Sequence, residues 1–343
     1  MYRTPQRFQS ASKKSLAGLV VVATAAAVAT WVQYRANQAG RANAPEGQFI
    51  EVDGVRLHYV ERGQGPAVVL LHGNNVWWRD FQASGLIDVL ARKHRVIAFD
   101  RPGFGHSERP RDRFWTPSAQ AKLVAAAMAS LGVARSAVVG HSMGSLVALA
   151  LALDHPGRVG TLALLSGYHF PKLRLDAVMM APVAVPVLGD VMRYTVTALS
   201  ARAMLNRAVK LMFAPNDVPA DFLRVLSREM LLRPLQLRAN AEDATCMMHS
   251  AGELSERLHE LRMPITIVAG ECDAVVDVEA HSKRLHQALP GSRLVVVPGA
   301  GHMVHHVAQQ QIAEALSSEV APEGAVQDPL IAAPTVEPSS PKV

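Results

Sequence analysis

The chain has 343 residues, of which 49% are apolar and 19% are charged, with 23 glycines and 21 prolines spread along it. This composition excludes a disordered or fibrous protein, and the length suits two domains or one large α/β domain with an insertion. The net charge of +6 comes from scattered arginines without a basic stripe alternating with aromatic residues, so nucleic acid is not expected as a partner. Two cysteines, Cys246 and Cys272, exclude a disulfide framework and a Cys-rich zinc site, but leave one bridge open.

The N-terminal region has the pattern of an export or anchoring signal. Residues 1–14 contain four basic residues and no acidic one, and residues 15–34 contain an apolar run from 16 to 32. An uncleaved membrane anchor is favoured over a signal peptide, for which Ala27-Val28-Ala29 offers a cleavage site. The basic residues predict a cytoplasmic N-terminus and a body on the exported, periplasmic or extracellular side, and cleavage would leave a secreted or periplasmic protein.

Polar or proline-rich segments border the body of the protein. Residues 35–47 are predicted to be a polar linker, and the body covers residues 48–318. Residues 319–343, which contain five prolines, are predicted to be a disordered tail. Nothing in the sequence indicates the oligomeric state.

The body alternates strand and helix patterns. Two segments with period-two alternation flank Asp53-Gly54, which predicts an opening antiparallel hairpin. Short apolar runs typical of buried parallel strands follow at residues 67–71, 96–99, 137–139, 161–165, 265–269 and 294–297. Helical periods lie between most of them, for example at residues 118–131, 145–154 and 278–289. The predicted fold class is α/β, with a mostly parallel sheet and helices on both faces.

The interval between the fourth and fifth runs is too long for a connection. Residues 167–263 are therefore predicted to be an inserted helical cap that divides the core into residues 48–166 and 264–318. Within this insertion, residues 177–188 are all apolar and contain Pro182 and Pro186. This run could line an acyl pocket or pack as the core of the cap.

A G-x-S-x-G motif lies between a predicted strand and a predicted helix, at Gly140-His141-Ser142-Met143-Gly144. The two glycines allow a tight strand-to-helix turn that lifts the Ser142 hydroxyl clear of the backbone. A serine nucleophile needs a base and an orienting acid. Asp273 and His302 follow later predicted strands, and their order along the chain is that of the α/β hydrolases.

With these motifs the sequence resembles serine hydrolases of the α/β-hydrolase fold, of the cap-bearing esterase type, over about residues 48–318. The matching stretches are residues 71–74, 100–107, 140–144, 270–276 and 299–302. The resemblance implies that Ser142 is the nucleophile, His302 the general base and acid, and Asp273 the carboxylate that orients His302. It also implies an oxyanion hole formed by the backbone N–H groups of Met143 and Asn74, and no cofactor.

Other polar residues near these motifs have alternative interpretations. Asp277 could replace Asp273 as the acid, although it is better placed to cap the following helix, and Glu271 also flanks Asp273. His305 and His306 follow His302, but the glutamate of an HExxH metal pattern is missing, so no metal site is expected. Three further residues of these motifs are predicted to be structural: His72, His141 and Asp100.

A serine at the elbow excludes the relatives that use aspartate there, the epoxide hydrolases and haloalkane dehalogenases. The preferred reaction is hydrolysis of carboxylic esters of small lipophilic acyl groups through an acyl-enzyme, with thioester, lactone and amide still open. A C–C bond hydrolase, a perhydrolase or an acyltransferase would use the same three residues. A non-catalytic binding module of the same fold is the alternative from a different class.

Overall fold

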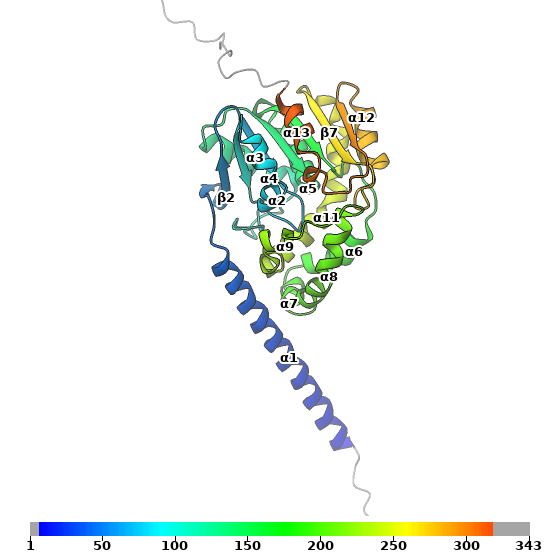
Figure 1. Cartoon of the computed structure of the whole chain (residues 1–343). Helices are drawn as coiled ribbons and strands as arrows, with labels where there is room; N and C mark the ends of the chain where they lie inside the picture. Colours follow the sequence, from blue (N-terminus) through cyan, green and yellow to red (C-terminus); the bar gives the residue numbers. More distant parts are fainter. Residues whose placement is uncertain (1–6, 318–343) are drawn as a thin grey trace, which may run out of the picture.

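The computed structural model describes residues 7–317 (Figure 1). The predicted tail at 319–343 and the first six residues of the basic N-terminus lie outside the described residues. The strands are β1 (Gln48–Val52), β2 (Val55–Arg62), β3 (Ala67–Leu71), β4 (Arg95–Phe99), β5 (Ser136–His141), β6 (Val159–Leu165), β7 (Ile265–Gly270) and β8 (Arg293–Val297). The helices outside the later insertion are α1 (Arg7–Ala42), α2 (Arg79–Ala83), α3 (Leu86–Leu90), α4 (Pro117–Ser130), α5 (Met143–Asp154), α12 (Arg284–Ala288) and α13 (Gln309–Ser317).

The eight strands form one sheet in the order β1-β2-β4-β3-β5-β6-β7-β8. β2 pairs antiparallel with both of its neighbours, and the other pairs are parallel, so β2 alone runs against the rest. The predicted opening hairpin and the six predicted strands are confirmed, but the prediction that all six are buried is wrong for β8, which lies at the edge of the sheet and is only half-buried. Asp53 and Gly54 both have positive φ, 50° and 71°, which is the conformation that a two-residue hairpin turn requires.

The sheet has a separate apolar core on each face because successive strand residues point to opposite sides. Val69 and Leu71 of β3 pack on one face with α4 and α5. Val68 and Leu70 pack on the other face with α2, α3 and α13. Helices on both faces of a mostly parallel sheet confirm the predicted fold class.

The helix α1 is longer than the predicted anchor and projects from the body (Figure 1). It continues to Ala42, so the prediction of a linker over residues 35–47 is wrong for its first eight residues. This stretch is rich in alanine and other good helix formers, and the next proline is Pro45. Packing of Ala39, which is 3% exposed, also holds this part of the helix against the body. Residues 16–42 are long and apolar enough to cross a membrane, and an 18-residue window within them has a mean hydropathy of 1.8.

Every helix between β6 and β7 belongs to the segment predicted to be an insertion, residues 167–263, which we call the helical insertion. Its helices are α6 (Leu175–Ala184), α7 (Leu188–Tyr194), α8 (Val196–Phe213), α9 (Phe222–Val225), α10 (Arg228–Leu231) and α11 (Pro234–Glu256). Neither interpretation of the apolar run at 177–188 describes all of it. Val183 is buried and Met180 lines a cavity, but Met179 is 79% exposed and Val187 is 75% exposed.

Candidate active site

Ser142 lies at the tight turn between β5 and α5, with a φ of 53° and a half-buried side chain. The turn requires both glycines of the motif. A Cβ on Gly140 would lie 2.3 Å from the carbonyl oxygen of Gly144, and a Cβ on Gly144 would lie 2.0 Å from the carbonyl oxygen of Leu71. The positive φ of a non-glycine residue is strained, and here it turns the serine away from the strand.

Asp273 and His302 meet at the same edge of the sheet, where β7 and β8 end. His302 Nδ1–H donates a hydrogen bond of 2.8 Å to Asp273 Oδ2, and the Asp273 side chain is fully buried. The other carboxylate oxygen accepts N–H bonds of 2.8 Å from both Val275 and Val276. These contacts fix the carboxylate and leave Nε2 of His302 as the free ring nitrogen.

The ring of His141 joins the turn that carries Ser142 to the loop that carries His302. His141 Nε2–H donates to the carbonyl oxygen of His302 at 3.0 Å, and the two rings lie 4.9 Å apart. Burial, together with the neighbouring histidines, lowers the pKa of His141 well below its usual value, so this ring stays neutral. Among residues 7–317, no group hydrogen-bonds Ser142 Oγ or His302 Nε2, which leaves both atoms free for a substrate.

The first turn of α5 and the loop after β3 supply free backbone N–H groups beside Ser142. Met143 begins α5, and Gly73 lies so close that a Cβ on it would be 3.0 Å from the Ser142 Cβ. In the described part of the chain, neither the Met143 N–H nor the Asn74 N–H has an acceptor. The Asn74 side chain is occupied, because its Oδ1 accepts a 2.6 Å hydrogen bond from Arg101. The backbone N–H of Asn74 is available to an oxyanion, because no described residue accepts it.

Arg101 holds this loop in place, a role that the sequence motifs did not indicate. Its guanidinium and Nε donate to the carbonyl oxygens of His72 and Gly73 as well as to Asn74, at 2.7, 3.1 and 2.6 Å. A 2.6 Å ion pair joins it to Asp243 of α11, and both side chains are fully buried. The motif Asp100-Arg101-Pro102-Gly103 marks the turn but gives no sign that its arginine supports the neighbouring loop.

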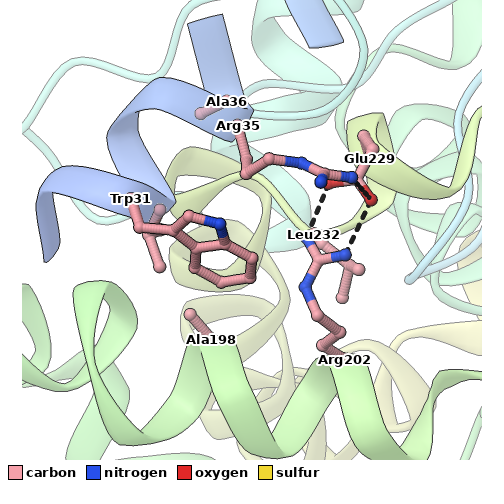
Figure 2. A pocket seen from close by; sticks show the side chains of 8 residues that line it. Trp31, Arg35, Ala36, Ala198, Arg202, Glu229 and Leu232 are labelled. Atoms are coloured by element: carbon pink, nitrogen blue, oxygen red, sulfur yellow. Dashed lines mark hydrogen bonds and ion pairs between the residues drawn. The ribbon is translucent and has the colours of Figure 1, made fainter. Parts of the chain in front are cut away.

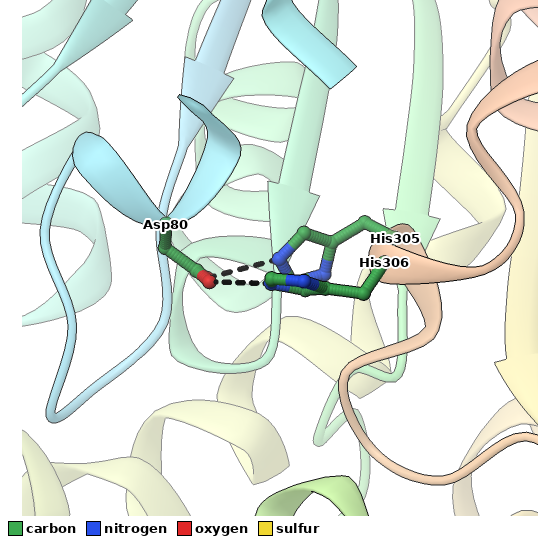
Figure 3. A group of neighbouring side chains, drawn as sticks. All are labelled: Asp80, His305 and His306. Atoms are coloured by element: carbon green, nitrogen blue, oxygen red, sulfur yellow. Dashed lines mark hydrogen bonds and ion pairs between the residues drawn. The ribbon is translucent and has the colours of Figure 1, made fainter. Parts of the chain in front are cut away.

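Behind His302, Asp80 of α2 accepts hydrogen bonds of 2.9 Å from His305 and His306 (Figure 3). Burial would raise the pKa of the Asp80 carboxyl, but the two histidines hold it below its usual range. The His305 ring packs 4.4 Å from that of His141. These residues could supply three ligands to a metal, with donor atoms within 4.8 Å of one another, but each carboxylate oxygen already accepts a ring N–H. The arrangement fixes the loop that carries His302.

The remaining candidates of the sequence analysis lie around this centre without joining it. Asp277 Oδ1 accepts the Ala280 N–H at 3.0 Å, as a helix-capping residue does, and Glu271 accepts the Gly299 N–H at 3.0 Å. Both ring nitrogens of His72 are bonded, to Gly73 O and to the Arg101 N–H. Asp100 likewise bonds backbone N–H groups and the ring of His58. Cys246 and Cys272 are free thiols, so they do not form a bridge.

A cavity of about 190 Å³ lies in the helical insertion, close to the candidate active site. Asn75 and Val76, which directly follow Asn74, form one end of its wall. Met212 of α8 is also in the wall, and its carbonyl oxygen accepts the Met303 N–H at 3.3 Å, beside His302. The wall is largely apolar and contains no lysine or arginine among the described residues.

The sequence matches the alpha/beta hydrolase fold family over residues 66–309. An uncharacterised hydrolase of Bacillus subtilis, YugF, is 28% identical over 277 residues, which cover 77% of this chain and 93% of that protein. A 2-hydroxy-6-oxononadienedioate/2-hydroxy-6-oxononatrienedioate hydrolase of Burkholderia vietnamiensis is 28% identical over 253 residues, covering 72% and 85%. Among solved structures, an esterase from Exiguobacterium antarcticum has a TM-score of 0.66 at 22% identity, covering 80% of this chain and 98% of that one.

The match over residues 66–309 establishes the family, and the chain belongs to the alpha/beta hydrolase fold family. The protein is therefore a hydrolase of this fold. The position of the helical insertion between β6 and β7 and the strand-end positions of Ser142, Asp273 and His302 are consistent with that assignment.

Proposed function

We propose that the protein is a serine esterase that cleaves carboxylic esters through Ser142, His302 and Asp273. The observation that carries this proposal is the 2.8 Å hydrogen bond between His302 and a fully buried Asp273, on loops next to the strained turn of Ser142. A carboxylate in this position holds the imidazole in the tautomer whose Nε2 accepts a proton. Aspartate-dependent relatives lack the serine that this site presents.

In the proposed reaction, His302 Nε2 takes the proton of the Ser142 hydroxyl as Oγ attacks the acyl carbonyl carbon. The tetrahedral intermediate collapses, the ester C–O bond breaks, and His302 gives the proton to the departing alkoxide. Water then enters, loses a proton to His302 and attacks the acyl-enzyme, which releases the acid and restores Ser142. Asp273 stays ionised and stabilises the imidazolium in both steps.

The negative charge of each tetrahedral intermediate would lie against the N–H groups of Met143 and Asn74. Both groups are unpaired among the described residues, and Met143 is at the positive end of the α5 dipole. Loss of one such donor typically costs about 10²-fold or more in rate. Arg101 would act as a positioning residue, because it holds the loop that presents the Asn74 N–H.

The cavity beside the site favours an apolar acyl group over acetate. Its wall is formed mainly by apolar side chains of α8, with Leu231 of α10 and Leu237 of α11, and burial of each CH₂ contributes up to about 0.8 kcal/mol. We infer a preference for medium-length aliphatic or small aromatic acyl esters. Small-molecule esters are thus the proposed substrates, without a cofactor.

A C–C bond hydrolase is the second candidate, because relatives such as the Burkholderia vietnamiensis enzyme are named for that reaction. The name of that enzyme's substrate describes a dicarboxylate. The described wall of the cavity here offers amides and hydroxyls but no lysine or arginine to pair with carboxylates. This observation favours the ester. Perhydrolase and acyltransferase reactions with the same three residues remain alternatives.

We further propose that α1 anchors the protein in a membrane with the body on the exported side. The support is the apolar stretch within residues 16–42 and the basic residues that precede it. Most of the described side chains of α1 are exposed, and Leu19 and Val21 are 67% and 68% exposed. Such exposure is expected for a helix that faces lipid.

The central experiment compares the wild type with Ser142→Ala. We expect a fluorophosphonate probe to label the wild type at Ser142 and ester turnover to fall on the order of 10⁴-fold or more in the variant. The variant should retain the wild-type circular dichroism spectrum and melting temperature, because the hydroxyl has no partner in the described structure. Full activity of Ser142→Ala would refute the serine mechanism, and absence of labelling would favour a binding module.

A series of p-nitrophenyl esters from acetate to decanoate tests the acyl preference. We expect kcat/KM to rise from acetate to a medium chain length, because each added CH₂ enters the cavity. A matched variant, Val209→Trp, fills the cavity wall from α8 and should shift the optimum to shorter chains. A steady fall from acetate upwards in the wild type would show that the cavity does not hold the acyl group.

A further inference from the structure

The helical insertion exposes an unusual amount of apolar surface at one corner. Residues 177–184 and 188–194 are two helical segments, apolar apart from Asp190 and Arg193, that meet at an angle of 108°, and α8 follows directly. We call their exposed side chains the apolar elbow: Met179, Val187, Leu188, Val191, Val196 and Leu199, which are between 45% and 79% exposed. Soluble surfaces rarely gather this many large apolar side chains, so the apolar elbow requires a partner.

The same corner of the insertion is attached to α1. Trp31 of α1 lies against Arg202 of α8, with the guanidinium 5.0 Å from the ring centroid, and Arg35 reaches Glu229 of α10 (Figure 2). Glu229 also accepts two hydrogen bonds from Arg202, at 2.7 and 2.6 Å. One carboxylate therefore joins an arginine of α1 to an arginine of the insertion. The bilayer that α1 crosses must lie at a defined place relative to the insertion.

The level of that bilayer can be read along α1. The apolar run ends at Val32, and Trp31, Tyr34 and Arg35 are residues typical of a membrane–water boundary. Val28 lies one helical turn before Val32, which places it about 6 Å inside this boundary. It packs in the same small cluster as Tyr194 and Ala198. Tyr194 ends α7 and Ala198 lies in the first turn of α8. The apolar elbow thus lies at the same depth as Val28, a position of α1 that is within the proposed lipid layer.

We propose that the apolar elbow is embedded in the interfacial layer of the bilayer that α1 crosses, and that the acyl substrate enters from this layer. The second part rests on the proposed esterase function. Met180 of α6 and Met204 of α8 both line the cavity beside the active site, and Met204 is also 60% exposed. A lipophilic ester dissolved in the bilayer could reach the cavity between these helices without crossing water.

A lipid surface fits the apolar elbow better than a second copy or another protein. The elbow lies beside an apolar span, at the depth where that span leaves the membrane, and both surfaces are apolar. A second copy of this chain could cover the apolar elbow only if both α1 helices crossed the same bilayer and the two elbows faced each other. A lipid surface imposes no such constraint.

The first measurement is the depth of the apolar elbow in phosphatidylcholine vesicles, with the full chain. Burial raises the pKa of the Cys246 thiol to about 12, so Cys272→Ser removes the reactive thiol. In that background, Leu188→Cys or Val191→Cys carries a fluorophore, and Gln287→Cys on exposed α12 is the matched control. Lipids with a nitroxide near the head of the acyl chain should quench the elbow labels at least threefold more than the control.

Equal quenching at all three positions would overturn the proposal. The same holds if the elbow labels are shielded from water but not quenched by lipid, and their energy transfer to one another rises with protein density. That outcome would assign the apolar elbow to a contact between copies. The measurement needs no catalysis, so it stands even if the wild type hydrolyses no ester, a result that would refute only the proposed function and substrate entry.

The second measurement uses activity on two substrates. Leu188→Asp with Val191→Asp should lower hydrolysis of a long-chain ester in the vesicles at least tenfold and leave hydrolysis of water-soluble p-nitrophenyl butyrate unchanged. Leu188→Ala with Val191→Ala, which adds no charge, should retain most of both activities. Unchanged activity on both substrates, or an equal loss on both, would refute entry through the apolar elbow.

Discussion

Asp273 and Asp277 are four residues apart, but they lie in different surroundings and have different expected roles. Asp273 is fully buried against His302 and two backbone N–H groups, whereas Asp277 is exposed, caps a helix start and pairs with Lys172 at 2.9 Å. An exposed pair of this kind contributes at most about 1 kcal/mol. The distinction between the two acids is therefore one of position, not of residue type.

Asp273→Asn should reduce kcat by on the order of 10³- to 10⁴-fold, because an amide cannot hold His302 in the working tautomer or stabilise the imidazolium. Asp277→Asn is the matched control and should change kcat less than about twofold and stability by at most about 1 kcal/mol, because asparagine still accepts the Ala280 N–H and only the exposed pair with Lys172 is lost. Steady-state kinetics and urea unfolding of both variants measure these effects. The opposite ranking in kcat would transfer the acid's role to Asp277.

The residues of the candidate site differ in how far the sequence could reveal them. Ser142, Asp273 and His302 were predictable because each follows a strand, and parallel strands end at the same edge of a sheet. Arg101 and Asp80 were not, since their roles depend on contacts with residues far along the chain, Asp243 and His305 among them. Long-range pairs of polar residues leave no periodic signal in a single sequence.

At the scale of elements, the junction between α1 and the body is where the sequence-based prediction failed. A polar stretch without a hydrophobic period suggested a linker, and the sheet's start near Phe49 made Pro45 a natural boundary. The helix continues because Val32 and Ala39, at 5% and 3% exposure, pack against the body and Arg35 forms an ion pair with Glu229. A buried side formed by so few residues is too narrow to give a hydrophobic period in the sequence. The core strands were easier to predict, since each contains a short run of mainly apolar residues.

Two shortened chains test the importance of this junction. A chain that begins at Thr30 keeps the contacts of Trp31, Arg35 and Ala39, whereas one that begins at Pro45 loses them. The second should be less stable by about 2 kcal/mol, the value of burying a valine and an alanine, which lowers the melting temperature by roughly 4–8 °C. Differential scanning calorimetry of the two soluble chains measures the difference. Equal melting temperatures would show that α1 does not stabilise the insertion.

The whole molecule carries several buried histidines that remain neutral, and this determines its response to acid. Burial lowers the pKa of His72 to about 4, and burial lowers the pKa of His169 to about 3. In the unfolded chain both have a pKa near 6.5, so below this pH the unfolded state binds protons that the folded state does not. Their effect is absent above pH 7 and grows as the pH falls from about 6.5 to 4.

The free energy of unfolding should therefore fall with decreasing pH in this window, by about 1.4 kcal/mol per pH unit for each such histidine. His169→Gln keeps an amide group to bond the Ser145 hydroxyl, which now lies 2.8 Å from His169 Nε2. This substitution should reduce the slope of the free energy of unfolding against pH by about 1.4 kcal/mol per pH unit. Urea unfolding of the chain that begins at Thr30, at pH 7, 6 and 5, provides the comparison. An unchanged slope would mean that His169 is protonated in the folded state.

The shared carboxylate of Glu229, which ties Arg35 of α1 to Arg202 of the insertion, also affects how turnover should be measured. If α1 lies in a bilayer as proposed, the active site keeps a constant orientation to that bilayer, and an ester dissolved in the membrane reaches it by diffusion in the membrane plane. The rate on such a membrane-dissolved ester should then follow its mole fraction in the membrane and not its bulk concentration. Addition of inert phospholipid at constant total ester would slow it by surface dilution, while addition of buffer would leave the rate per enzyme unchanged.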